Sequence, residues 1–253
     1  MKLWRVMILL ASGGILFLGC GVSIEEQRKA SIHSRLGYQY LQEGNSSGAL
    51  RELTEAEKLN PKDPSIQFAL GLAYNAKGKF QDGLEHFRKA LILDPKYTEA
   101  HNAIGATYLE LGQWDDAIRE FEITLKDLFY LTPFYVMNNI GWAYYKKGDR
   151  VKAIEYFQKA VRTKPDFGLA NYNLGLALRD NKQPAEAIAA FQAAIATVPN
   201  FLDAHLQLGL LLYNSGKWEE SQKAFQEVVR LAPQSESARL AQGYLDLLKK
   251  SGK

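Results

Sequence analysis

Apolar, small and turn-forming residues recur along most of the chain with a period of about 34 positions. Each period has a glycine directly after a leucine or isoleucine. A tyrosine or leucine follows three positions later, a small residue twelve positions later, and a phenylalanine or leucine sixteen positions later. The glycines are Gly37, Gly71, Gly105, Gly141, Gly175 and Gly209. A fixed period of this length is typical of an array of stacked repeats.

Each period predicts a hairpin of two α-helices. The first half carries apolar residues at helical spacing and, in five of the six periods, ends at a second glycine that suits a turn. These turn glycines are Gly44, Gly78, Gly112, Gly148 and Gly216. The second half, for example residues 114–121, is again amphipathic and usually stops near a proline, which cannot continue a helix. Because one hairpin cannot bury its apolar face alone, we expect the hairpins to stack closely through their small residues, with Tyr and Phe between the layers.

The pattern resembles the tetratricopeptide repeat over residues 30–235, in six units. The resemblance implies an all-α fold, a right-handed superhelical solenoid with a concave face made by the first helices. Residues 236–253 predict one more amphipathic helix, from 238 to 250, which we expect to cap the last repeat.

The third repeat departs from this pattern. It runs two residues longer than the others, and Phe129 stands where a proline is expected, followed by residues 130–133. One interpretation is a harmless loop insertion, because loops tolerate changes in length at little cost. The other is that the longer joint changes the superhelix and shapes a docking surface. The sequence leaves both open.

The first residues predict export. Lys2 and Arg5 precede an uncharged, strongly apolar stretch, residues 6–24, as in an export signal. The only cysteine, Cys20, follows a glycine, and the segment resembles a bacterial lipoprotein signal, although Phe17 stands where that family usually has leucine. The resemblance implies removal of residues 1–19 and a covalent lipid such as palmitate on Cys20.

Two other interpretations of this segment remain open. The uncharged stretch of 19 residues is long enough for a transmembrane helix, which needs about 17–25 residues. An ordinary secretion signal is the other. Under the lipoprotein interpretation, Gly21 replaces the aspartate that marks inner-membrane retention, which favours the periplasmic face of the outer membrane. Residues 20–29 would then form a tether whose nine residues after the cysteine span roughly 30 Å when extended, so we expect the solenoid to lie close to the membrane.

Charge and composition exclude several classes of function. The chain has 31 basic and 28 acidic residues, and removal of Lys2 and Arg5 would reduce its net charge from +3 to +1. Binding to nucleic acid is not expected, because it needs a basic surface. A single cysteine excludes an intrachain disulfide and a zinc site made of several thiolates.

Catalytic motifs are absent from the sequence. It contains no nucleophile elbow, phosphate-binding glycine loop or zinc-protease motif, so we expect no enzyme, no metal and no cofactor beyond the lipid on Cys20. His33, His101 and His205 share one repeat position and are expected to pack between helices. We expect His86, alone on a second helix, to be exposed.

In the tetratricopeptide family, certain positions of the first helices line a concave protein-binding groove. In this chain they are Tyr38, Leu41, Phe68, Leu72, Asn75, Asn102, Leu109, Tyr135, Asn138, Trp142, Tyr145, Tyr172, Leu176, Arg179, Leu206, Leu210 and Tyr213. Each one could instead pack only against a neighbouring helix, but together they form an apolar stripe, which usually marks a partner. The hypothesis is that a protein segment lies there.

In this hypothesis Asn102 and Asn138 hold the backbone of the bound segment. Trp142, Tyr145 and Tyr172 contact its side chains. The Lys and Arg pattern of co-chaperones that clamp a peptide carboxylate is missing.

As a whole, the chain is similar to the type IV pilus biogenesis lipoproteins, the pilotins. The similarity lies in the signal with Cys20, the six repeats, and residues 127–133 and 139–141 of the stretched joint. It implies a lipid-anchored, non-enzymatic scaffold whose partner is the secretin subunit of the pilus machinery. The alternative is a periplasmic repeat adaptor in cell-wall or envelope assembly. An enzyme or co-chaperone is a more distant third.

Overall fold

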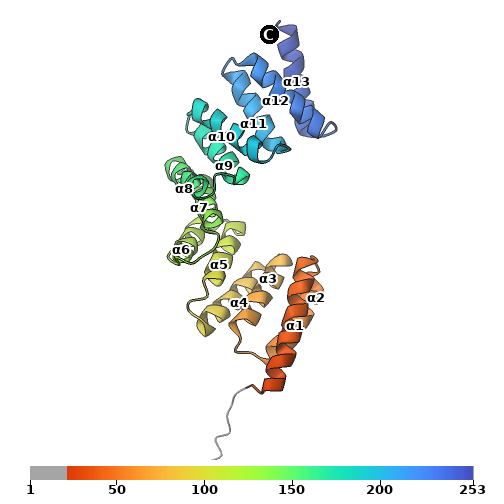
Figure 1. Ribbon diagram of the computed structural model, residues 1–253, viewed down its shortest axis with the longest axis vertical. Helices are drawn as coiled ribbons and strands as arrows, with labels where there is room; N and C mark the ends of the chain where they lie inside the picture. Colours follow the sequence, from red (N-terminus) through yellow and green to blue (C-terminus); the bar gives the residue numbers. More distant parts are fainter. Residues whose placement is uncertain (1–21, 253) are drawn as a thin grey trace, which may run out of the picture.

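The computed structural model describes residues 22–252. This part of the chain forms thirteen α-helices and no β-strand (Figure 1). Successive helices pair as hairpins, which stack in chain order into a long, curved array with α1 at one end and α13 at the other (Figure 1). The helices are α1 (Ile24–Gln42), α2 (Ser46–Leu59), α3 (Pro64–Ala76), α4 (Phe80–Leu93), α5 (Thr98–Glu110), α6 (Trp114–Thr124), α7 (Pro133–Lys147), α8 (Arg150–Thr163), α9 (Gly168–Asp180), α10 (Pro184–Thr197), α11 (Leu202–Asn214), α12 (Trp218–Leu231) and α13 (Glu236–Lys250).

The repeat glycine of each first helix faces a large side chain of its partner helix. A Cβ atom at Gly71 would lie 2.4 Å from Cε1 of Phe87, and one at Gly141 would lie 2.7 Å from Cδ1 of Phe157. The large side chains at this position are all fully buried: Leu53, Phe87, Phe121, Phe157, Phe191 and Phe225. The predicted close contact between paired helices is therefore confirmed, and it requires glycine because a larger residue would overlap the ring.

The five predicted turn glycines all have positive φ angles, between 70° and 85°. The fifth hairpin has no glycine at its turn, and there Lys182 adopts a φ of 60°. A lysine in this left-handed conformation is strained, because its Cβ approaches the following carbonyl oxygen. The turn geometry is thus retained in the fifth hairpin even where the residue that suits it is missing.

The first helix starts earlier than expected. Ser23 Oγ accepts a hydrogen bond from the Glu26 amide at 3.2 Å, and Glu26 Oε2 accepts one from the Ser23 amide at 2.9 Å. This capping box satisfies two amides at the helix start and fixes it at Ile24. The expectation of an extended tether through Lys29 is therefore wrong from Ile24 onward. The signal, the anchor at Cys20 and the transmembrane alternative up to residue 21 lie outside the described residues.

The extra length of the third repeat lies in the connection between α6 and α7. Helix α6 has 11 residues, whereas the other second helices have 14, and residues 125–132 connect it to α7. Asp127 fixes this connection: its Oδ1 accepts from the Phe129 amide at 2.9 Å, and its Oδ2 accepts from Thr98 Oγ1 on α5 at 2.8 Å. The joint is therefore tied to the preceding repeat.

Helix α13 closes the array. It starts two residues before the predicted start and ends at Lys250, as predicted. Ala238, Ala241 and Leu248 are buried, and the helix packs on α12 and α11. Between residues 22 and 252, no helix is both long and apolar enough to cross a membrane.

Candidate functional site

A cavity of about 510 Å³ lies on the face made by the first helices of the middle repeats. Its walls come from α5, α7 and α9, with one residue from the start of α6. The lining residues are Leu109, Glu110, Trp114, Asn138, Asn139, Trp142, Leu169, Tyr172 and Asn173. Apolar and aromatic walls with a few polar groups are typical of a ligand site, and the volume falls within the usual range of about 300–1,000 Å³.

Two buried side-chain amides that line this cavity are joined by a hydrogen bond. Asn173 Nδ2 on α9 donates a hydrogen bond to Asn138 Oδ1 on α7 at 2.9 Å. The Asn138 nitrogen and the Asn173 oxygen remain able to donate and accept. A peptide backbone needs one acceptor and one donor of this kind, because each unit carries an N–H and a C=O group. The hydrogen bond fixes the orientation of both amides in the cavity wall.

Asn173 was missed in the sequence, and Asn102 does not line the cavity. Asn139 and Asn173 stand two positions before the repeat glycine, where the second and third repeats have Ala69 and Ala103. The first and sixth repeats have Arg35 and Gln207 at this position, so a polar residue there does not by itself mark the cavity. The cavity therefore pairs Asn138 with Asn173 rather than with Asn102.

Trp142 and Tyr172 form the aromatic walls. The Trp142 ring stacks on Tyr145 with 5.4 Å between centroids, and Lys146 Nζ lies 5.4 Å from the Trp142 ring centre. Tyr172 packs against Phe201 at 4.8 Å, and burial raises the pKa of its phenol. Both rings are held by neighbours, so little conformational freedom is lost when a partner binds.

Tyr145 has a different role. Its hydroxyl donates to Asp180 Oδ2 on α9 at 2.6 Å, and burial, followed by this hydrogen bond, raises the pKa of the phenol. Burial alone would raise the pKa of Asp180, but hydrogen bonds from Tyr145 and Arg179 outweigh it and lower the pKa. Tyr145 thus braces α7 against α9 and does not line the cavity.

The other predicted groove residues are spread along the array. The Tyr38 hydroxyl donates to the Ser65 carbonyl at 3.4 Å, and Tyr135 packs on Phe167 at 4.8 Å. Leu72 and Leu176 are partly buried against the cores of the second and fifth repeats. Of the nine predicted groove residues weighted most, only Asn138, Trp142 and Tyr172 meet in the cavity.

Three of the four histidines form a hydrogen bond to the paired helix. His33 bonds to Glu52 and His101 to Glu120, each through Nδ1, at 2.9 and 2.7 Å. The prediction that His86 is exposed is wrong: it is half-buried, stacks on Tyr74 at 5.1 Å and bonds to Gln67 at 2.8 Å. Its position faces the first helix, so the ring is covered.

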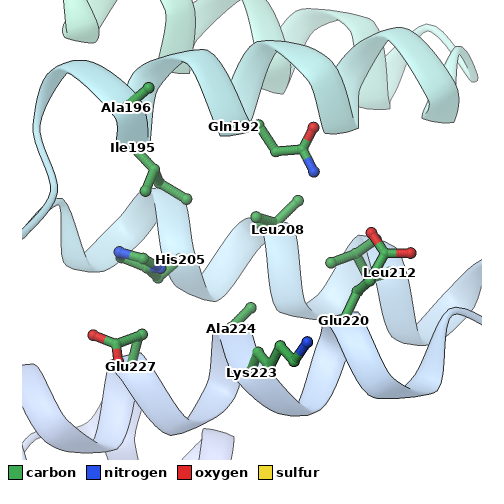
Figure 2. A pocket seen from close by; sticks show the side chains of 10 residues that line it. All are labelled: Gln192, Ile195, Ala196, His205, Leu208, Leu212, Glu220, Lys223, Ala224 and Glu227. Carbon is green, nitrogen blue, oxygen red and sulfur yellow. The ribbon is translucent and has the colours of Figure 1, made fainter.

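His205 has no such partner, because Ala224 stands at the position of Glu52 and Glu120. Its Nε2 donates instead to the Pro199 carbonyl at 2.8 Å. A second cavity of about 390 Å³ opens here between α10, α11 and α12. Figure 2 shows Leu208 and Ile195 facing this space, with charged side chains at its border. Its lining contains no Trp, Tyr or Phe.

No group of three or more His, Cys, Asp or Glu side chains among residues 22–252 is arranged to hold a metal ion. The first cavity offers aromatic rings, the side-chain amides of three asparagines and the Glu110 carboxylate.

Comparison with known proteins identifies the repeat. A sequence profile of the tetratricopeptide repeat matches residues 34–98, 102–166 and 138–200, and a second profile of the same repeat matches 74–127 and 178–243. The chain belongs to the tetratricopeptide repeat family. The predicted all-α solenoid is confirmed, and as a tetratricopeptide-repeat protein the chain is a scaffold for protein–protein interaction. No curated protein matches it by sequence.

Several solved structures share the fold. PilF of Pseudomonas aeruginosa has a TM-score of 0.76 at 20% identity, over 87% of this chain and 99% of its own. PilW, described as a widely conserved type IV pilus biogenesis factor, has a TM-score of 0.77 at 21% identity, over 84% of this chain and 98% of its own. YrrB, a tetratricopeptide protein with an unusual peptide-binding site, has a TM-score of 0.60 at 20% identity, over 76% and 97%.

Proposed function

We propose that this protein is a pilotin: a lipid-anchored scaffold that binds the secretin subunit of the type IV pilus machinery and assists its assembly in the outer membrane. The observation that carries the proposal is the nearly end-to-end match with PilF and PilW, at TM-scores of 0.76 and 0.77. The match extends over nearly the whole of both chains, so it supports more than a shared repeat motif.

The cavity between α5, α7 and α9 is the proposed docking site for a secretin segment. In the proposed complex, Asn138 donates to a backbone carbonyl of the segment and Asn173 accepts from a backbone amide. Trp142 and Tyr172 pack against the side chains on either side. Because the Asn173–Asn138 bond already orients both amides, binding loses little entropy in ordering them.

The proposed anchor is a lipid on Cys20. Since α1 begins at Ile24, three residues separate the anchor from the solenoid, and they span roughly 10 Å when extended. The greatest distance between the solenoid and the membrane would thus be shorter than with a nine-residue tether.

The test is the amount of heat-resistant secretin multimer in outer-membrane fractions from cells with and without this gene. We expect multimers to disappear without the gene and a Cys20→Ala form to fail to restore them. Unchanged multimers together with defects in cell shape or antibiotic sensitivity would favour the envelope adaptor instead.

A further inference from the structure

The connection between α6 and α7 presents three large apolar side chains to solvent. Leu128 is 91% exposed, Phe129 89% and Leu131 91%. Between them, Tyr130 is half-buried and packs toward the core of the third repeat. Single exposed apolar residues are common, but three together on one short loop mark a contact with another body.

Hydrogen bonds within the loop and to α5 fix the conformation that exposes these side chains. The Asp127 carboxylate accepts from the Phe129 amide and from Thr98 Oγ1, and the Tyr130 amide donates to the Asp127 carbonyl at 3.2 Å. With Tyr130 packed beneath it, the loop cannot fold its apolar side chains inward without breaking these bonds. The three side chains are therefore held outward.

The loop lies on the edge of the solenoid at which α1 begins. In each hairpin the second helix ends, and the next first helix begins, on this edge, and α1 also begins there. Ile24, the first residue of α1, is 87% exposed, and Ile92, in the last turn of α4, is 79% exposed. With the loop residues, these are the five most exposed large apolar side chains between residues 22 and 252. The next, Val151 at 70%, lies at the start of a second helix, on the opposite edge.

We propose that residues 128–131 insert into the headgroup region of a phospholipid bilayer, as a membrane contact additional to the anchored amino terminus. This orientation rests on the proposed function, because the lipid on Cys20 would hold the start of α1 within roughly 10 Å of the bilayer. The same edge then faces the lipid. Leu and Phe side chains are suited to the boundary between headgroups and acyl chains.

A bilayer fits this loop better than a protein partner does. The three side chains project outward at about nine-tenths exposure, so they offer a partner protein no pocket of their own, and a fluid bilayer needs none. Lys96 and Lys126, on the same edge, are exposed and can approach anionic headgroups, while Glu99 and Asp127 beside the loop carry the opposite charge, so the apolar side chains make the main contact.

The experiment places a fluorescent probe at the loop. Every residue of the five buried clusters lies between Ala30 and Ala241, so a chain of residues 22–253 keeps the whole core. That chain has no cysteine, because Cys20 is the only one, and a Leu131→Cys variant can be labelled with the dye NBD at a single site. An amino-terminal histidine tag would tether it to vesicles of phosphatidylethanolamine and phosphatidylglycerol that contain a nickel-chelating lipid. Val151→Cys, labelled in the same way, is the matched control on the opposite edge.

We expect vesicles to shift the emission of the probe at position 131 to shorter wavelength, raise its intensity severalfold and expose it to quenching by doxyl lipids. The emission of the probe at position 151 should keep the wavelength and intensity that it has in water. Adding Leu128→Ser and Phe129→Ser should return the signal at position 131 toward that of water. A water-like probe at position 131 would overturn the proposal and point to a protein contact. Because the tag replaces Cys20, neither result depends on acylation, which palmitate labelling of the full chain tests separately.

Discussion

The first three hairpins and the sixth differ at one pair of positions. In the first three, a long polar side chain on the first helix meets another on the second. These pairs are His33 with Glu52, Gln67 with His86 and His101 with Glu120. In the sixth, His205 faces Ala224, turns to the Pro199 carbonyl and leaves the cavity of Figure 2. The repeat glycine is the same in both regions, and it packs on a phenylalanine in the second, third and sixth hairpins and on Leu53 in the first.

The difference shows that the residues that pack the two helices together are distinct from those that shape the surface beside them. Gly71 and Phe87 in the second hairpin make the same contact as Gly209 and Phe225 in the sixth, where a Cβ on the glycine would lie 2.7 Å from the ring. These positions fix the hairpin. The positions of His205 and Ala224 vary from hairpin to hairpin, and in the sixth hairpin these two residues line a cavity.

The largest effect is expected at the shared positions. Phe157→Ala should lower the free energy of unfolding by about 3–5 kcal/mol, because it leaves a cavity between two helices and their neighbours. Val151→Ala, on the same helix but exposed, should change it by less than about 0.5 kcal/mol. Urea denaturation followed by circular dichroism measures both. Similar effects from the two variants would contradict the proposed distinction between packing and surface residues.

A smaller effect is expected from giving the sixth hairpin the missing partner. Ala224→Glu should place a carboxylate beside Nδ1 of His205, as in the first and third hairpins, and raise the free energy of unfolding by about 1 kcal/mol. The same substitution combined with His205→Ala should lose this gain in a double-mutant cycle. An equal gain with and without the histidine would show that filling the cavity, and not the pair, is responsible.

The second hairpin should depend on pH. Burial, and then the charge of Lys89, lowers the pKa of His86. The unfolded chain takes up a proton near pH 6.5, before the folded chain does. Stability is therefore present above that pH and falls as the pH drops through the folded pKa. His86→Gln should flatten this part of the curve of unfolding free energy against pH. An unchanged slope would mean that another group is responsible.

The smallest effect is expected at the turn of the fifth hairpin. Lys182→Gly should stabilise the chain by about 0.5 kcal/mol, because it relieves the left-handed lysine at the cost of a more flexible unfolded chain. The reciprocal change, Gly148→Ala, should destabilise it by about 1 kcal/mol. Thermal unfolding compares the two, and a loss of stability in Lys182→Gly would contradict the proposed strain.

Most of the fold could be predicted from the sequence, because its determinants are local and repeated. A glycine and a phenylalanine sixteen positions apart pack the same way in each hairpin that has them. The early start of α1 could also have been predicted, since Ser23 and Glu26 have the spacing of a capping box. It was missed because the helix begins before the repeat does.

The site was predicted only in part. Asn138, Trp142 and Tyr172 come together, but Asn173 was missed and Tyr145 braces a neighbouring helix. Asp180, the hydrogen-bond partner of Tyr145, lies 35 positions away in the chain. Whether a side chain of a first helix faces the groove or the next repeat depends on the angle between repeats. The period alone does not determine that angle.

The central claim is that the cavity between α5, α7 and α9 binds the secretin. The most direct test measures heat-resistant secretin multimers in cells that carry Trp142→Ala with Tyr172→Ala, with Val151→Ala as the control. The account predicts that multimers fall toward the level of cells lacking the gene, while the double variant remains folded and is present in normal amount, and that the control is unaffected. Wild-type multimer levels with a folded double variant would contradict it.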